Sequence, residues 1–214
     1  MLSYQLLKNH AGILLIGDYT SLNWLHEVVH DVNERSPLVR DKEGMFLSLA
    51  YDVRKAFEQQ REILLPPQNQ EAVGVRYGVR ILWPVLLMQQ RMLRTSLGYL
   101  DHSAKVQAIA YALEAIIEEA LREDFGKQGE SIIDLWQRLN PAYPSVFDML
   151  KSRGAIFCSW TKRQRKANLQ QLLISFDPMY DSFYQLRIRR GETNLMSPDE
   201  MALWENAEWP DPRW

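Results

Sequence analysis

The sequence predicts an α+β fold, in which a small, mainly antiparallel sheet in the N-terminal part packs with a helix-rich C-terminal part. The β-strand patterns lie before residue 83, whereas amphipathic helical patterns dominate after it. This segregation is typical of α+β proteins rather than of alternating βαβ units. We therefore predict a single α+β domain over 1–214, with a sheet-bearing lobe, 1–83, and a helical lobe, 84–214, which carries a tryptophan-rich acidic tail.

The predicted sheet-bearing lobe begins with a β-hairpin and a helix. Two short apolar runs, 2–7 and 12–17, are separated by a polar break, which is typical of two hairpin strands. Asp18 and the residues after it offer capping side chains for a helix start. The helix itself is indicated by apolar residues at helical spacing, Leu22, Leu25, Val29 and Val32.

Three further elements are predicted before residue 83. They are a helix over 45–59, a strand over 62–65 and a strand over 73–82. The last of these has the clearest pattern, in which Val73, Val75, Tyr77, Val79 and Ile81 face one way and mostly glycine and arginine face the other. Such alternation indicates a strand that is buried on one side and wet on the other.

Helical patterns follow one another through the predicted helical lobe. Pro84 fits the first turn of a helix that runs to about residue 100, because the missing N–H of proline is harmless there. Ser103 is a capping residue for the next helix, and Gly126 is a plausible end for it. Further helices are predicted over 130–139, 145–152, 160–175 and 179–189, and the residues Ser197-Pro198-Asp199-Glu200 predict a last helix start.

Composition and charge narrow the class of protein. Hydrophobic residues make up 46% and charged residues 24% of the 214-residue chain, as in ordinary globular proteins. The formal net charge of −2 does not favour a protein that binds bulk nucleic acid, because such proteins are usually strongly basic. The N-terminal residues lack a signal-peptide pattern, and no run approaches the roughly 18 apolar residues of a membrane span. We therefore expect a cytoplasmic protein without membrane contact.

The single cysteine, Cys158, cannot form an internal disulfide, which fits a reducing compartment. Ile156 and Phe157 precede it and have the character of core residues. No histidine lies near it in the sequence to activate the thiol. We therefore expect Cys158 to be a buried structural residue.

One motif points to catalysis. His26-Glu27-Val28-Val29-His30 matches the pattern H-E-x-x-H, and two of the four histidines of the chain lie in it. Because residues four apart share one side of a helix, His26 and His30 could bind one zinc ion, and Glu27 would then activate a zinc-bound water. This alternative makes the chain a zinc-dependent hydrolase or protease.

The context of the motif weighs against zinc. A catalytic zinc site needs a third protein ligand, and no further histidine follows at short spacing, so Glu43, Glu58 or Glu62 would have to serve. Asp31 follows the motif directly, where zincins prefer an uncharged residue, and only 25 residues precede the motif. We therefore predict no catalytic residue, no metal and no cofactor, and keep zinc at this motif as the alternative.

Two segments have the character of contact surface. Four cations lie among five residues at a predicted helix start, and they are Lys162, Arg163, Arg165 and Lys166. Such a cluster is typical of either a solvated face or a docking patch for an acidic partner or nucleic acid. Trp204, Trp209 and Trp214 are spaced five apart in an acidic tail. Tryptophan is common in interface hot spots, so this tail either folds back onto its own core or contacts a second subunit.

Several short segments resemble an uncharacterised bacterial family, a domain of unknown function. They are Lys8-Asn9-His10-Ala11-Gly12, Ile16-Gly17-Asp18-Tyr19, Leu25-His26-Glu27-Val28-Val29, Ala50-Tyr51-Asp52-Val53-Arg54 and Ile81-Leu82-Trp83-Pro84. The resemblance spans most of the chain, and the tryptophan-rich acidic end is in keeping with it. It implies a bacterial cytoplasmic protein, and it supplies no activity, substrate or catalytic residues.

These observations lead to a predicted function. We expect a non-catalytic interaction protein of accessory or immunity type, which acts by binding another macromolecule and could accompany a toxin or phage-defence system. The partner would be another protein or a second copy of the chain, since symmetric dimers are the commonest oligomers. The alternatives are the zinc-dependent hydrolase and a nucleic-acid-binding protein that uses the basic cluster, although the net charge does not favour the latter.

Overall fold

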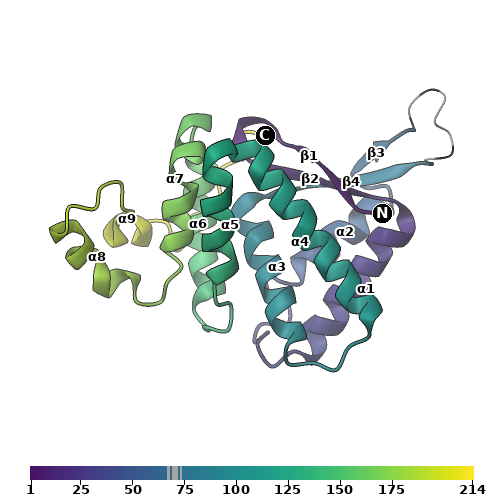
Figure 1. The fold of residues 1–214 in the computed structure, drawn as a ribbon, viewed down its shortest axis with the longest axis horizontal. Helices are drawn as coiled ribbons and strands as arrows, with labels where there is room; N and C mark the ends of the chain where they lie inside the picture. The colour runs from purple at the N-terminus through teal and green to yellow at the C-terminus, as the bar shows by residue number, and fades with distance from the viewer. Residues whose placement is uncertain (67, 69–71, 73) are drawn as a thin grey trace.

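The computed structural model describes residues 1–66, 68, 72 and 74–214 and shows an α+β fold (Figure 1). The N-terminal part contains a four-stranded antiparallel sheet, and helices make up most of the chain that follows. Figure 1 shows the sheet along one side of the helices. The predicted fold class, a small antiparallel sheet packed with a helix-rich C-terminal part, is confirmed.

The sheet has the strand order β1-β2-β4-β3. Its strands are β1 Ser3–Leu6, β2 Gly12–Gly17, β3 Glu62–Leu64 and β4 Arg76–Leu82. β1 and β2 form the predicted hairpin, and both later strands are present where the sequence predicts them. The sequence predicted the last strand over 73–82. In the structure β4 begins at Arg76, so Gly74 and Val75 precede it, and Val73 lies outside the described residues.

Alternation along the strands gives the sheet an apolar face and a polar face. Ile13 of β2 pairs with Ile81 of β4, and both belong to the main buried cluster that the helices complete. On the opposite face, Arg80 of β4 forms an ion pair with Glu62 of β3 at 2.7 Å, and both side chains are partly exposed. One face of the sheet thus packs on the helices, and the other carries this partly exposed ion pair at the β4–β3 edge, while β2 is buried throughout.

The helices are α1 Tyr19–Arg35, α2 Ser48–Phe57, α3 Trp83–Leu97, α4 Ala104–Phe125, α5 Gly129–Arg138, α6 Val146–Ser159, α7 Lys162–Ile174, α8 Tyr180–Arg189 and α9 Pro198–Ala202. Local caps set several boundaries. Asp18 accepts a hydrogen bond from the backbone N–H of Ser21 at 2.8 Å, and Gly126 ends α4 with a φ of 55°. Across the described ranges, each helix is too short or too polar to cross a membrane.

α6 continues to Ser159, whereas the sequence predicted an end at 152. The helix continues because Ala155, Ile156 and Phe157 bury their side chains against neighbouring elements. Gly154, a poor helix former, is accommodated within it because Trp209 of the tail packs directly on its backbone.

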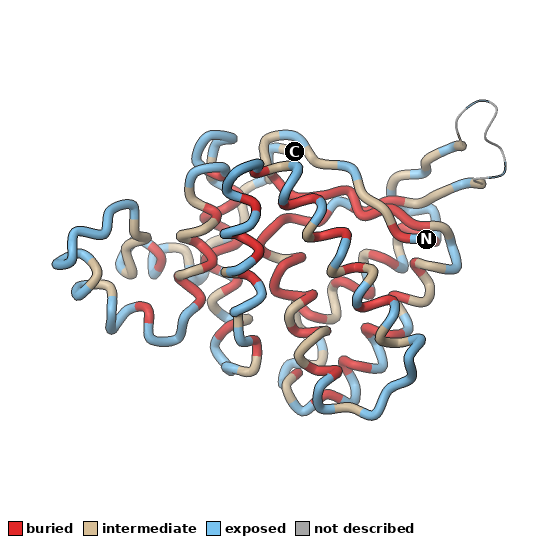
Figure 2. The backbone as a smooth tube through the Cα atoms, viewed as in Figure 1, coloured by how far each residue is buried: buried red, intermediate tan, exposed pale blue. Residues whose placement is uncertain are grey.

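A main cluster of buried apolar residues joins both predicted lobes (Figure 2). It extends from Leu2 to Phe176 and includes Trp83 and Trp136, whose side chains are fully buried. A smaller cluster lies where α6, α8 and α9 meet, and its members are Ile156, Tyr180 and Met201. α8 and α9 project from the rest of the molecule in Figure 1. The boundaries of a single domain remain a prediction.

Candidate functional site

The two histidines of the His26–His30 motif lie side by side on α1. Their ring centroids are 4.6 Å apart, and the rings meet edge to face. His26 is partly buried and also packs edge-on against Phe57 of α2 at 5.8 Å, whereas His30 is exposed. The helical spacing therefore brings the two imidazoles together.

The surroundings of His26 favour its neutral form. Burial lowers the pKa of His26, and the nearby His30 and Arg54 lower it further, while Glu27 and Glu58 act in the opposite direction. The buried Nδ1 atom of His26 has no hydrogen-bond partner among the described residues. His26 is therefore a neutral imidazole at neutral pH.

Among the described residues, no third ligand accompanies this pair. In the part of the chain that the structure describes, no three His, Cys, Asp or Glu side chains are placed to share one metal ion. Glu27, Glu58 and Glu62 pair instead with Asn23 at 3.0 Å, Arg54 at 3.8 Å and Arg80 at 2.7 Å. The arrangement thus supplies two imidazoles. Of the three glutamates considered as a third ligand, Glu58 and Glu62 are paired with arginine side chains, and Glu27 is the residue considered for activating water.

Arg165, one of the four predicted contact cations, is fully buried. Its guanidinium donates hydrogen bonds to the main-chain carbonyl oxygens of Phe157 at 3.1 Å, Cys158 at 3.2 Å and Arg213 at 3.0 Å. These bonds tie the end of α6 to the C-terminal tail. The interpretation of Arg165 as part of an exposed contact patch is wrong, because its charge is turned inward and used by the fold.

Cys158 lies beside this tie and is buried, as predicted. Burial raises the pKa of the Cys158 thiol to about 11, although the neighbouring Arg165 acts to lower it. The thiol is therefore protonated at neutral pH. A protonated, buried thiol is a poor nucleophile, so Cys158 has a structural role.

The other three cations of the cluster are exposed. Lys162, Arg163 and Lys166 lie in the first two turns of α7. Cations oppose the helix dipole at this end, and a capping box between Thr161 and Gln164 stabilises the helix start despite them. These three side chains are thus free to meet solvent or a partner.

The tryptophan-rich tail folds back onto its own chain. Trp209 packs so closely on Gly154 that a Cβ atom there would lie 2.1 Å from the indole ring. Trp214 packs against the main cluster, and its carbonyl oxygen accepts a hydrogen bond from Asn9 at 3.4 Å. Trp204 packs against the smaller cluster. The structure therefore shows the first of the two predicted arrangements, and all three indoles are partly buried in it.

A buried polar group joins three elements that the sequence analysis did not connect. One carboxylate oxygen of Asp124 accepts a hydrogen bond from Trp83 Nε1 at 2.9 Å, and the other lies 2.8 Å from His10 Nδ1. The side chains of His10 and Asp124 are only 12% and 6% exposed. No local pattern could have revealed this group, because Asp124 lies 114 positions from His10 and 41 from Trp83.

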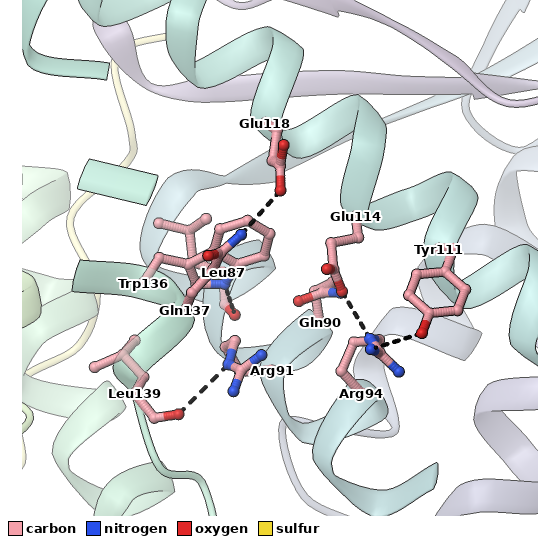
Figure 3. Close-up of polar contacts among 10 residues, drawn as sticks. All are labelled: Leu87, Gln90, Arg91, Arg94, Tyr111, Glu114, Glu118, Trp136, Gln137 and Leu139. Carbon is pink, nitrogen blue, oxygen red and sulfur yellow. Dashed lines mark hydrogen bonds and ion pairs between the residues drawn. The ribbon is translucent and has the colours of Figure 1, made fainter. Parts of the chain in front are cut away.

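A second polar network fastens α3 to α4 (Figure 3). Glu114 accepts hydrogen bonds from Gln90 at 2.7 Å and from Arg94 at 2.8 Å, and Arg94 also donates to the hydroxyl of Tyr111 at 3.1 Å. Hydrogen bonds between α5 and its neighbours complete the network. Trp136 donates to the Leu87 carbonyl at 2.8 Å, and Gln137 donates to Glu118 at 2.9 Å. Arg91 of α3 donates to the carbonyl of Leu139, just after α5, at 3.4 Å. These groups bond one another across the helix interfaces, and we assign them to packing.

α8 presents apolar side chains to solvent. Tyr180 is its only buried residue, whereas Met179, Phe183 and Leu186 are 51%, 45% and 41% exposed. Their spacing of four and three residues places them on one side of the helix, and Met179 immediately precedes its first turn. We call these three residues the α8 face. Figure 2 shows α8 as one of the most exposed parts of the chain.

Hollows of small-molecule size flank this end of the molecule. One of about 490 Å³ lies between α5, α7 and the start of α8, and its lining includes Arg138, Met179 and Arg187. Another of about 430 Å³ lies between α6, α7 and the segment 194–204. A third of about 300 Å³ lies between the α1–α2 and α5–α6 connections.

The comparisons with known proteins identify a family. The model of DUF6904, a domain of unknown function, matches residues 2–214. The chain therefore belongs to this family, and the resemblance to an uncharacterised family that the sequence indicated is confirmed. Neither a curated protein nor a solved structure was found to match the chain.

Proposed function

We propose that this member of the DUF6904 family is a non-catalytic interaction protein of accessory or immunity type, which binds through the α8 face. The proposal keeps the predicted function but moves the main contact from the basic cluster and the tail to α8. The chain's one cysteine is a free thiol, which fits a reducing compartment such as the cytoplasm.

The exposure of α8 carries this proposal. Isolated helices shorter than about 12 residues are marginal in water, and helices in proteins owe most of their stability to packing of an apolar face. α8 has 10 residues and buries Tyr180 alone, while Met179, Phe183 and Leu186 remain in contact with solvent. An amphipathic helix that shows its apolar side to solvent is a common means of protein recognition.

The charges around α8 favour a second copy of this chain as the partner. Asp177 and Asp181 are exposed near the start of the helix, and Arg189 and Arg190 are exposed near its end. Two α8 helices can pack along their length about a two-fold axis perpendicular to them, and they then run antiparallel. The basic end of one helix then lies beside the acidic end of the other, with the two α8 faces between them.

Site-specific cross-linking in the full chain tests this pairing. We would place a photo-reactive phenylalanine analogue at position 183 and, as a control, at Tyr99, which is 62% exposed and lies far along the chain from α8. We expect position 183 to give an adduct of twice the 25.1 kDa chain mass, and light scattering to show a dimer that Phe183→Glu dissociates.

Two different results would contradict different parts of this proposal. A single-chain mass at tens of micromolar, together with equal cross-linking from positions 183 and 99, would contradict the proposed contact surface. An adduct in host extract that joins position 183 to a different protein would retain the interaction function and refute self-association.

A further inference from the structure

The hollow between α6, α7 and the segment 194–204 has the size of a small-molecule site. Its volume of about 430 Å³ lies within the range of roughly 300–1,000 Å³ that is usual for ligand pockets. Two hydrogen bonds hold the segment 194–204 in place beside the hollow. Asn194 donates a hydrogen bond to Asn168 of α7 at 3.2 Å, and the hydroxyl of Tyr180 donates to the Met196 carbonyl at 2.8 Å.

Two tryptophans and two methionines line this hollow. Trp160 follows α6 and Trp204 follows α9, and both are only partly buried by the protein. Met196 and Met201 supply further polarisable surface. The face of an indole ring attracts cations more strongly than any other side-chain ring, so this lining favours a positively charged guest.

The lining contains an acidic side chain, whose negative charge would attract a positively charged guest. Glu200 is the acidic residue among the described residues that form the lining, and the other polar side chains there are amides and hydroxyls. The cations of α7 are not part of the lining: Lys162, Arg163 and Lys166 lie outside it, and Arg165 is turned toward the tail. The site therefore combines one carboxylate, aromatic surface and neutral acceptors.

We propose that this hollow binds a small organic cation with a substituted ammonium head. The carboxylate of Glu200 would oppose the charge, and Trp160 and Trp204 would contact the alkyl groups on nitrogen. The size of the hollow favours a whole small molecule over the tip of a peptide side chain. The inference is independent of the α8 face, because Met179, Phe183 and Leu186 all lie outside this lining.

Titration with choline and with its neutral isostere, 3,3-dimethyl-1-butanol, tests the inference on the full chain. The two ligands have nearly the same shape and differ by one positive charge. We expect saturable calorimetric binding of choline alone, together with shifts of the Met196 and Met201 methyl signals in NMR spectra. A trimethyllysine peptide presents the same head from a protein, so weaker binding of the peptide than of choline would assign the site to a free cation.

Variants locate the site. Glu200→Gln keeps the shape of the side chain and should weaken choline binding by up to about fivefold, as expected for the loss of an ion pair at an exposed carboxylate. Glu205→Gln removes a neighbouring exposed carboxylate that is outside the lining, and it should leave choline binding unchanged. Trp204→Leu should abolish binding while circular dichroism confirms the fold.

Three outcomes would overturn the proposal. The first is no saturable binding of choline or of the trimethyllysine peptide, and the second is equal affinity for choline and its neutral isostere. The third is an equal effect of Glu200→Gln and Glu205→Gln, which would assign any attraction to general surface charge.

Discussion

The guanidinium of Arg165 and the carbonyl oxygen of Arg213 are 3.0 Å apart, although 48 positions separate them in the sequence. This bond, with those from Arg165 to Phe157 and Cys158, makes one buried cation the junction of α6, α7 and the tail. A buried arginine that is satisfied by carbonyl oxygens is costly to replace, because each carbonyl then loses a charged donor where burial restricts replacement by water.

Arg165→Lys should therefore destabilise the protein despite its preserved charge. A single ammonium group cannot reproduce the planar fork that reaches several carbonyl oxygens. We expect the free energy of unfolding to fall by about 2–4 kcal/mol in urea denaturation. Arg163→Lys, at an exposed position of the same helix, should change it by less than about 0.5 kcal/mol. Equal effects of the two changes would refute the structural role of Arg165.

Gly154→Ala should loosen the tail. The added Cβ atom would lie 2.1 Å from Trp209, so the indole must leave its place, and we expect a loss of about 1–3 kcal/mol. In a Trp209→Ala background the same change should be neutral or stabilising, because alanine suits a helix better than glycine. A double-mutant cycle measured by thermal or urea unfolding gives the coupling, and the absence of coupling would contradict the packing.

Cys158 should resist alkylation in the folded protein. Its pKa of about 11 means that the reactive thiolate is scarce at pH 8, and burial further blocks the reagent. The folded-state pKa exceeds the ordinary value of 9.0, so the stabilisation is present below pH 9 and declines as the pH rises toward 11. We expect iodoacetamide to modify the unfolded chain much faster, and Cys158→Ala to reduce the loss of stability above pH 9. Rapid labelling of the native protein would contradict this account.

His26 should titrate below its ordinary pKa of 6.5, because it is buried and lies beside His30 and Arg54. NMR signals of the imidazole protons measure this midpoint, and His30→Asn should raise it by removing a like charge. Since the folded-state pKa is lowered, the protein should lose stability as the pH falls below about 6.5, where the unfolded chain accepts the proton more readily. A midpoint at or above 6.5 would show that His26 is more exposed to water than the structure indicates.

Local signals in the sequence explain how much of the fold was predictable. Asp18 and Gly126 act on the residues beside them, so their capping roles can be inferred from the sequence alone. The alternation that ends at Ile81 likewise reflects one strand and one sheet face. These patterns fix where most elements lie, and they do not depend on which distant elements pack together.

The candidate site residues depended on distant contacts and were harder to predict. Arg165 has the same local context as Arg163 and Lys166, and only the carbonyl oxygens of distant residues distinguish it. The partnership of His10 with Asp124 likewise forms only in the folded chain. The exposure of α8 could not be predicted either, because an amphipathic pattern does not tell whether its apolar side is covered.

The burial of Cys158 has a practical consequence for spectroscopy. Because this thiol is shielded and is the only cysteine in the chain, a cysteine introduced on the surface becomes the single site that reacts under native conditions. Spin labels or fluorophores can then be attached along α8 or beside α9 without first replacing Cys158. Distances between such labels would report directly how two molecules are arranged in solution.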